Sequence, residues 1–123
     1  MSGNNVRMMR YADVLLMRAE CTLMQGNLSG AINFINIVRR RFGTFEYTAR
    51  MYSETEVFDI LKHERQLELM GEGYRFNDLR RWGILEESLN PEFQKIYGTQ
   101  PVKASHYLFP IPQGELDTNF GIK

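Results

Sequence analysis

The sequence contains 123 residues with a mass of 14.4 kDa, 15 basic and 15 acidic side chains, and a formal net charge of zero. Its composition, 43% hydrophobic and 24% charged, is that of an ordinary globular protein and excludes a disordered, collagen-like or disulfide-stapled chain. A neutral chain also lacks the basic field that nucleic-acid binding needs. We therefore expect one compact domain over residues 1–123 and no nucleic-acid partner.

The sequence offers no targeting or membrane-spanning segment. The apolar run Val14–Met17 is shorter than the ~7 to 15 apolar residues of a secretory signal or the ~20 of a membrane span. A single cysteine, Cys21, cannot form an intramolecular disulfide, and we expect it to be a buried residue of a helix.

Two amphipathic helices are predicted near the start of the chain. Apolar residues recur three or four positions apart within Tyr11–Met24 and again within Leu28–Val38, as on one face of a helix. Gly26 should end the first helix, and Asn27 or Ser29 should cap the second. The two segments together predict a helical hairpin.

Small residues in this hairpin are spaced as in a tetratricopeptide repeat, with Ala19, Gly26 and Ala31 seven and five positions apart. A generic helical hairpin fits the same pattern equally well. Repeat proteins usually stack about three or more units, because one unit cannot bury its own faces. A homo-oligomer that covers an open end of the hairpin is therefore one expectation.

The segment Gly43–Tyr52 has no helical or strand period, and we predict an ordered, partly packed loop. An exposed aromatic ring in such a loop can offer a flat apolar face to a sugar or a peptide, although loop rings more often fill the core. Tyr47 and Tyr52 are the candidate ligand-stacking residues.

A third helix has the clearest start, because Ser53 followed by Glu56 forms a capping box. Gly71 and Gly73 should end it, and a shorter helix should follow from about Tyr74 to Trp82. The inner stripe of the third helix is predicted to consist of Val57, Ile60, Leu61, Leu67 and Met70.

All four prolines lie after residue 90, which separates a helical region over residues 10–83 from an irregular or mixed region over residues 84–123. In the second region we predict a short helix around Glu92–Tyr97 and an extended segment over Tyr107–Pro112. The expected fold class is all-α, with helical hairpins of tetratricopeptide-like type and an irregular, proline-containing C-terminal tail.

The segment Glu64–Gly83 is dense in charged and aromatic side chains on both sides of a glycine break. Its three glutamates lie four positions apart on one helix face, so they would repel one another unless arginines neutralise them. The arginines expected in this role are Arg65, Arg75 and Arg81. The structural interpretation is a salt-bridge network joining two helices, with Trp82 as a packing anchor. Its members are Glu64, Arg65, Glu68, Glu72, Arg75, Asp78, Arg81 and Trp82.

Catalytic alternatives for these residues are incomplete. A glycosidase needs two carboxylates across a cleft, which glutamates on one helix face do not provide without partners elsewhere. His63 and Glu64 do not begin a zinc-protease motif, because position 67 is leucine, and Gly71-Glu72-Gly73 lacks the strand and third glycine of a dinucleotide fingerprint. We expect no catalytic residues, no metal and no cofactor.

Four segments carry a resemblance to a known family. Arg10–Glu20 resembles a "RYADVLLMYAEA" helix, and Ala31–Arg41 resembles the "A...IN.VR.R.G" helix that follows it. Glu64–Gly83 is similar to "ER..EL..EG.R..DLRRWG", and Tyr107–Asn119 is similar to "YL.PIP..E...N". In this order the motifs resemble the C-terminal part of the SusD/RagB family of outer-membrane lipoproteins of Bacteroidetes.

The resemblance implies a mostly helical protein that captures oligosaccharides or other nutrients on the surface of a Gram-negative bacterium. It also implies delivery of the uncleaved ligand to a SusC-like TonB-dependent transporter. Members of the family are several times longer and are held to the membrane by an N-terminal lipid, so we expect this chain to be a C-terminal fragment without that anchor. No ligand-contacting residue belongs to the matched motifs.

Two other functions stay open at this stage. A stand-alone helical-repeat module would bind a protein through an apolar groove of its hairpins. A carboxylate hydrolase would need two converging Asp or Glu residues, one of them with a raised pKa.

Overall fold

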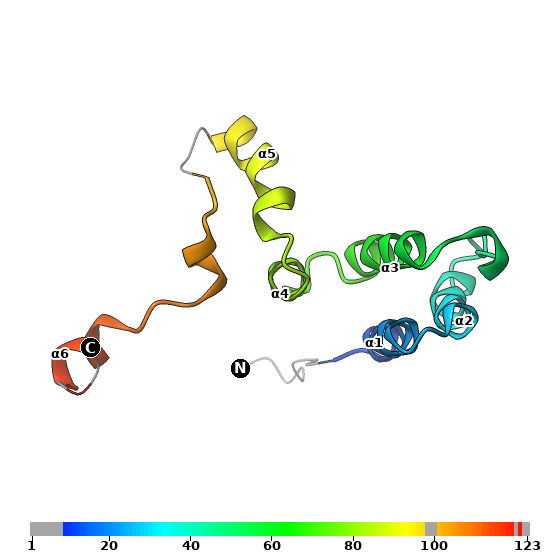
Figure 1. The fold of residues 1–123 in the computed structure, drawn as a ribbon, viewed down its shortest axis with the longest axis horizontal. Coiled ribbons are helices and arrows are strands. Elements are labelled where there is room, and N and C mark those ends of the chain that lie inside the picture. The colour runs from blue at the N-terminus through cyan, green and yellow to red at the C-terminus, as the bar shows by residue number, and fades with distance from the viewer. Residues whose placement is uncertain (1–8, 98–100, 120, 122–123) are drawn as a thin grey trace, which may run out of the picture. The chain divides into compact units, whose positions relative to one another are not determined.

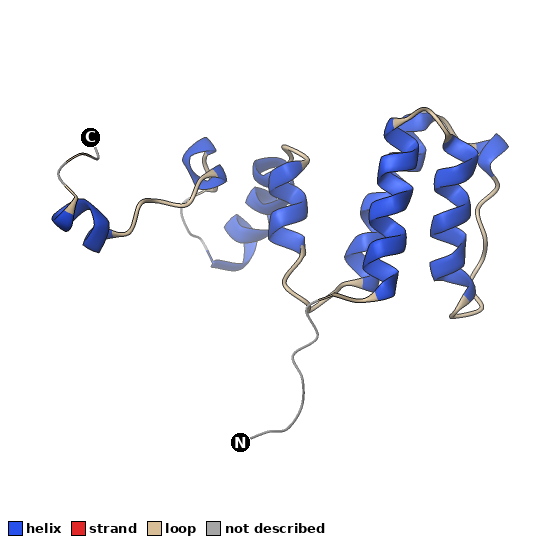
Figure 2. Cartoon of the chain, turned by 90° about the horizontal axis from the view of Figure 1, so that it is seen from below, coloured by secondary structure: helices blue, strands red, loops and turns tan. Residues whose placement is uncertain are grey.

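A computed structural model describes residues 9–97, 101–119 and 121. These residues form α-helices and short 3-10 helices joined by loops, and no strand occurs among them (Figure 1, Figure 2). The all-α prediction is therefore confirmed. The chain divides into two compact units, the first ending at Tyr74 and the second starting at Arg75.

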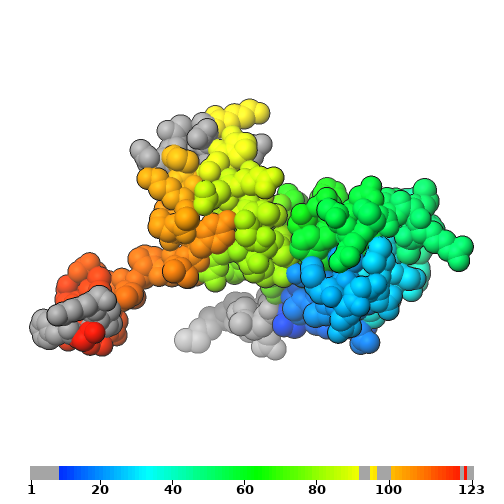
Figure 3. Space-filling model, viewed as in Figure 1, coloured from blue at the N-terminus to red at the C-terminus, as the bar shows by residue number. Residues whose placement is uncertain are grey.

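Three α-helices build the first unit: α1 (Tyr11–Met24), α2 (Leu28–Arg40) and α3 (Glu54–Glu68), with a 3-10 helix, η1 (Ala49–Met51), between α2 and α3. α1 and α2 form the predicted hairpin, and α3 packs against both of them. In the space-filling view the surfaces of these helices meet without a gap (Figure 3).

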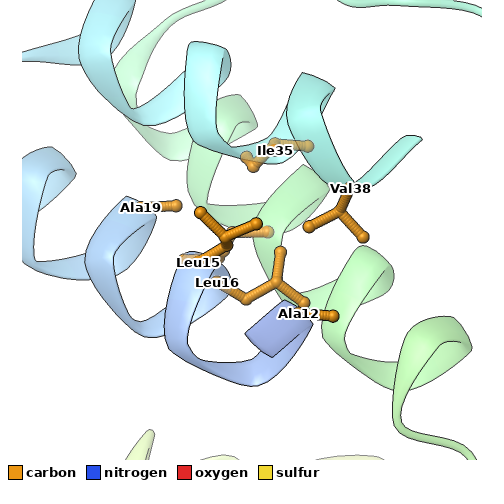
Figure 4. Close-up of a cluster of buried hydrophobic side chains, with 7 residues drawn as sticks. Ala12, Leu15, Leu16, Ala19, Ile35 and Val38 are labelled. Atoms are coloured by element: carbon orange, nitrogen blue, oxygen red, sulfur yellow. The ribbon is translucent and has the colours of Figure 1, made fainter. Parts of the chain in front are cut away.

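The core of this unit lies where the three helices meet. Leu15, Leu16 and Ala19 of α1 point toward Ile35 and Val38 of α2 (Figure 4), and all five side chains are buried. Alanine at position 19 leaves no exposed surface at all and lets the two helices approach closely. A second buried cluster continues the core toward the loop that precedes α3, and it contains Leu23, Ala31, Ile32 and Val57.

The helix boundaries follow the local signals of the sequence. Gly26, with φ of 78°, makes the left-handed turn after α1, and the Asn27 side chain then accepts a hydrogen bond from the backbone N–H of Gly30 at 2.8 Å. At the start of α3 the capping box is complete, because the Glu56 carboxylate accepts from the Ser53 N–H at 2.7 Å while the Ser53 hydroxyl accepts from the Glu56 N–H at 3.4 Å. These predictions are confirmed.

Three predictions of burial are wrong. Cys21 is exposed, since it lies five positions after buried Leu16 and therefore about 140° around α1. Leu67 is 54% exposed for the same reason, lying six positions after buried Leu61, and Met70 is 78% exposed in the turn beyond the end of α3.

The second unit contains α4 (Arg75–Arg81), α5 (Leu85–Tyr97), the 3-10 helix η2 (Ala104–Tyr107) and α6 (Gln113–Thr118). α4 contacts α5, and the Tyr107 hydroxyl accepts a hydrogen bond from the Leu85 N–H at 3.0 Å. The Asn90 side chain bonds both the N–H and the carbonyl of Val102, at 2.6 and 3.2 Å. These bonds attach the segment after α5 to the helix.

The predicted extent of the helix in this region is wrong. It begins at Leu85 rather than near Glu92, and it contains Pro91 in its interior. Proline removes one helical hydrogen bond, that to the carbonyl four residues earlier, and Glu87 at that position is exposed, so water can replace the missing donor. The segment Tyr107–Pro112 was predicted to be extended; Tyr107 instead ends η2, Leu108 has an extended conformation, and the residues from there to α6 are non-helical.

Candidate functional site

A pocket of about 420 Å³ opens in the first unit, where the residue before α1, the end of α2 and the C-terminal half of α3 come together. Three arginines and three glutamates form most of its lining. Two apolar side chains and a threonine complete it. The lining residues are Arg10, Arg39, Arg41, Phe42, Thr44, Glu64, Leu67, Glu68 and Glu72.

Each glutamate of the pocket is paired with an arginine. Arg39 Nη1 donates to Glu64 Oε2 at 2.6 Å, and Arg41 Nη2 donates to Glu68 Oε1 at 2.6 Å. Glu64 and Glu68 lie one turn apart on the same face of α3, whereas Glu72, expected on that helix face, lies in the turn beyond the end of α3. Arginines from outside α3 remove the repulsion between the three carboxylates.

Arg10 joins Glu68, the last residue of α3, to Glu72 in the turn that follows. Its Nη1 donates to Glu68 Oε1 at 2.7 Å, and its Nε donates to both oxygens of Glu72 at 2.9 and 3.0 Å. Its Nη2 donates to the Glu68 backbone carbonyl at 2.6 Å, which caps the C-terminal end of α3. The residue that precedes α1 is thereby fixed to the end of α3.

The arginines in this network are not the ones expected from the sequence. Arg65, Arg75 and Arg81 were the predicted partners of the three glutamates, whereas Arg10, Arg39 and Arg41 occupy those positions. Arg65 follows Glu64 by one residue, about 100° around the helix. It therefore points to α1, where its Nη1 donates to Asp13 Oδ1 at 3.0 Å in a pair that is 3% exposed on both sides.

The electrostatics of the pocket oppose acid catalysis. Hydrogen bonds to Glu72 and then to Glu68 raise the pKa of Arg10 above its ordinary value, and the Arg10 guanidinium lowers the pKa of the Glu72 carboxyl. A general acid needs a carboxyl with a raised pKa. The pairing of all three glutamates therefore argues against the carboxylate-hydrolase alternative at this face.

The two candidate stacking rings lie in the loop beside α2. Tyr47 is half-buried against both core clusters, the Arg39 guanidinium lies 4.6 Å from its ring centre, and the Asn36 side chain bonds its backbone N–H and carbonyl at 2.9 and 2.8 Å. Tyr52 is also half-buried and meets Tyr47 edge to face at 5.6 Å. The Phe45 ring meets the Tyr47 ring edge to face at 5.9 Å. Phe45 is 68% exposed, so it offers more ring surface than either tyrosine.

The remaining residues of the charged motif lie in the second unit. Arg81 Nε donates to Asp78 Oδ1 at 3.0 Å, and the Arg81 guanidinium lies 4.7 Å from the Trp82 ring centre. Burial lowers the pKa of Arg75, and the Asp78 charge opposes this shift. Arg75 Nη1 is the buried side-chain nitrogen that has no hydrogen-bond partner among the described residues.

Sequence reasoning missed the pocket itself. The residues that were not predicted as site residues are Arg10, Arg39, Arg41 and Phe42, although the spacing of the like-charged glutamates indicated that arginines must lie nearby.

In the part of the chain that the structure describes, no cluster of three His, Cys, Asp or Glu side chains could hold a metal ion. No helix there has the length and apolar character needed to cross a bilayer.

Comparisons with known proteins agree on one family. The SusD family model matches residues 1–123. SusD-like protein P25 of Formosa agariphila is 34% identical over 120 residues, covering 95% of this chain and 23% of that protein. SusD-like protein P2 of the same organism is 31% identical over 129 residues, covering 96% of this chain and 25% of that protein.

A solved structure gives the same answer. The crystal structure of a SusD superfamily protein from Bacteroides vulgatus is 41% identical, with a TM-score of 0.74 over 90% of this chain and 25% of that one. This chain spans about a quarter of the length of these relatives. The motifs, the helical fold and the matches together establish that the chain belongs to the SusD family.

Proposed function

We propose that the protein of which this chain forms a part captures oligosaccharides or other nutrients at the outer-membrane surface and passes them, uncleaved, to a SusC-like TonB-dependent transporter. Membership of the SusD family is the observation that carries this proposal. Binding proteins of this family are generally non-catalytic, and a carboxylate pocket with every glutamate held by an arginine is consistent with binding rather than hydrolysis.

Two features of the first unit support a sugar as the ligand. The pocket is rich in fixed donors and acceptors, which suits hydroxyl groups. Tyr47 of the loop Gly43–Tyr52 contacts Arg39, which lines the pocket. We propose stacking on Tyr47 or Tyr52, or on the more exposed Phe45.

One observation favours a protein-binding role instead. The outer face of α1 carries three exposed apolar side chains, Tyr11 at 73%, Met24 at 61% and Val14 at 39%. A helix that is apolar on both faces is usually covered on both. A helical-repeat interaction module is therefore the second candidate function.

A deletion strain and a crosslinking experiment in the parent strain test the proposal. A strain that lacks the gene encoding the chain should retain less of a fluorescent oligosaccharide at its surface than the parent strain, and a plasmid copy should restore retention. An epitope-tagged SusC-like transporter, crosslinked in the parent strain, should recover the protein with it. Unchanged retention together with no crosslinked product would contradict the proposal and favour the second candidate.

A further inference from the structure

We propose that the pocket between Arg10, the end of α2 and α3 is a subsite for an uncharged pyranose ring, with Arg41 and Phe42 as its ligand-contacting residues. This inference rests on the proposed function and assigns it a location. A volume of about 420 Å³ lies within the range of roughly 300 to 1,000 Å³ usual for small-molecule sites.

The charge of the pocket selects a neutral ligand. Three guanidinium groups face three carboxylates, so the lining has no net charge. All of them take part in ion pairs of 2.6 to 2.7 Å. An anionic or cationic ligand would meet one group of its own sign for each group of opposite sign, so the lining offers it no net attraction to offset the cost of removing its charge from water. An uncharged polyol can add hydrogen bonds without breaking any.

The ion pairs leave hydrogen-bonding atoms unused on arginine and on glutamate. Among the described residues, Arg41 uses only Nη2, which leaves Nε and Nη1 as donors, and its side chain is 52% exposed. Among the same residues, Glu64 accepts from Arg39 through Oε2, and Glu68 accepts from Arg10 and Arg41 through Oε1. The second carboxylate oxygen of each is left as an acceptor. A hydroxyl group is both donor and acceptor, so neighbouring hydroxyls of a sugar can bind a guanidinium and a carboxylate together.

The apolar part of the lining suits the other side of a sugar ring. Phe42 is 65% exposed and Leu67 is 54% exposed, and the Arg41 guanidinium lies 4.6 Å from the Phe42 ring centre. The C–H groups of a pyranose form an apolar surface that packs on such side chains. Exposed apolar groups beside unused donors and acceptors thus match the two kinds of surface that a pyranose presents.

Calorimetric titration of the whole protein that contains this chain tests the subsite. The probes are three neutral hexasaccharides, namely maltohexaose, cellohexaose and xylohexaose, and one anionic oligosaccharide, trigalacturonate. The variants are Arg41→Gln and Phe42→Ala. The matched control is Arg40→Gln, because the Arg40 side chain is 63% exposed, against 52% for Arg41, but it pairs with Glu46 and does not line the pocket. Circular dichroism should show that all three variants remain folded.

We expect at least one neutral hexasaccharide to bind, and both pocket variants to weaken its affinity about tenfold while the control leaves it unchanged. Neutral binding that Arg41→Gln and Phe42→Ala leave intact would overturn the subsite but not the proposed function. Tighter binding of trigalacturonate than of every neutral probe would overturn the choice of an uncharged ligand. Absence of binding to all four probes would overturn the subsite as well.

Discussion

Replacement of Arg65 by methionine tests the buried ion pair that joins α3 to α1. Arg65 Nη1 and Asp13 Oδ1 are 3.0 Å apart, and each side chain is 3% exposed. Arg65→Met keeps most of the apolar stem but leaves the Asp13 carboxylate buried without the guanidinium, since no other side chain among the described residues bonds it. Breaking a buried pair from one side costs about 3 to 5 kcal/mol.

A loss of this size is readily measured. In a domain of this length it corresponds to a decrease in Tm of about 10 to 20 °C. Thermal unfolding followed by circular dichroism, with a urea titration, gives the free energy of unfolding of both proteins. Arg40→Met is the matched control, because the Arg40–Glu46 pair is 63% and 44% exposed, and surface pairs contribute about 0 to 1 kcal/mol.

A double variant keeps the test decisive if Arg65→Met does not fold. Asp13→Leu combined with Arg65→Met removes both charges and fills the space with apolar atoms, so it should be more stable than Arg65→Met alone. A loss in Arg65→Met no greater than in Arg40→Met, or a double variant less stable than the single one, would refute the assignment of this pair as a buried structural link.

Three further predictions follow from the same structure. Asp78→Ala should reduce the free energy of unfolding by about 1 to 3 kcal/mol, because Asp78 is 5% exposed and binds Arg81; unchanged thermal unfolding would contradict this. Ala19→Leu should cost about 1 to 3 kcal/mol through overpacking, since Ala19 is 0% exposed between α1 and α2, and a wild-type urea midpoint would show that the helices have room for a larger side chain. Arg10 and Arg40 lower the pKa of Glu72 and Glu46 from 4.5, so these pairs should stabilise the fold above pH 4.5 and lose their effect as the pH falls through the lowered values. Urea titrations at pH 7, 4.5 and 3 measure this, and a midpoint that does not change between pH 4.5 and 3 would count against it.

The helices of the first unit could be predicted because their signals are local. Asn27, Ser53 and Glu56 act within one turn of their own position, and glycine at position 26 takes a backbone angle that other residues avoid. The buried stripe of α2 repeats at the helical period, so its inner face was evident from spacing alone. The prediction of burial was wrong for Cys21, because its apolar character does not indicate which side of α1 is covered.

The pocket could not be predicted, because its partners are far apart in sequence. Arg10 and Glu68 are 58 residues apart, and Arg41 and Glu68 are 27 apart. Local spacing showed that three glutamates needed counter-charges, yet the choice of arginine depends on how α1, α2 and α3 pack. The nearest arginine in sequence, Arg65, was the natural candidate, but its place on the helix directs it to Asp13 instead.

The measurement that tests the central claim most directly is calorimetric titration of the whole protein that contains this chain with neutral oligosaccharides, followed by chromatography of the sugar that is recovered. Binding without cleavage predicts saturable heat for at least one oligosaccharide and recovery of that oligosaccharide at its original length. Absence of heat for every oligosaccharide, or recovery of shortened products, would contradict the account.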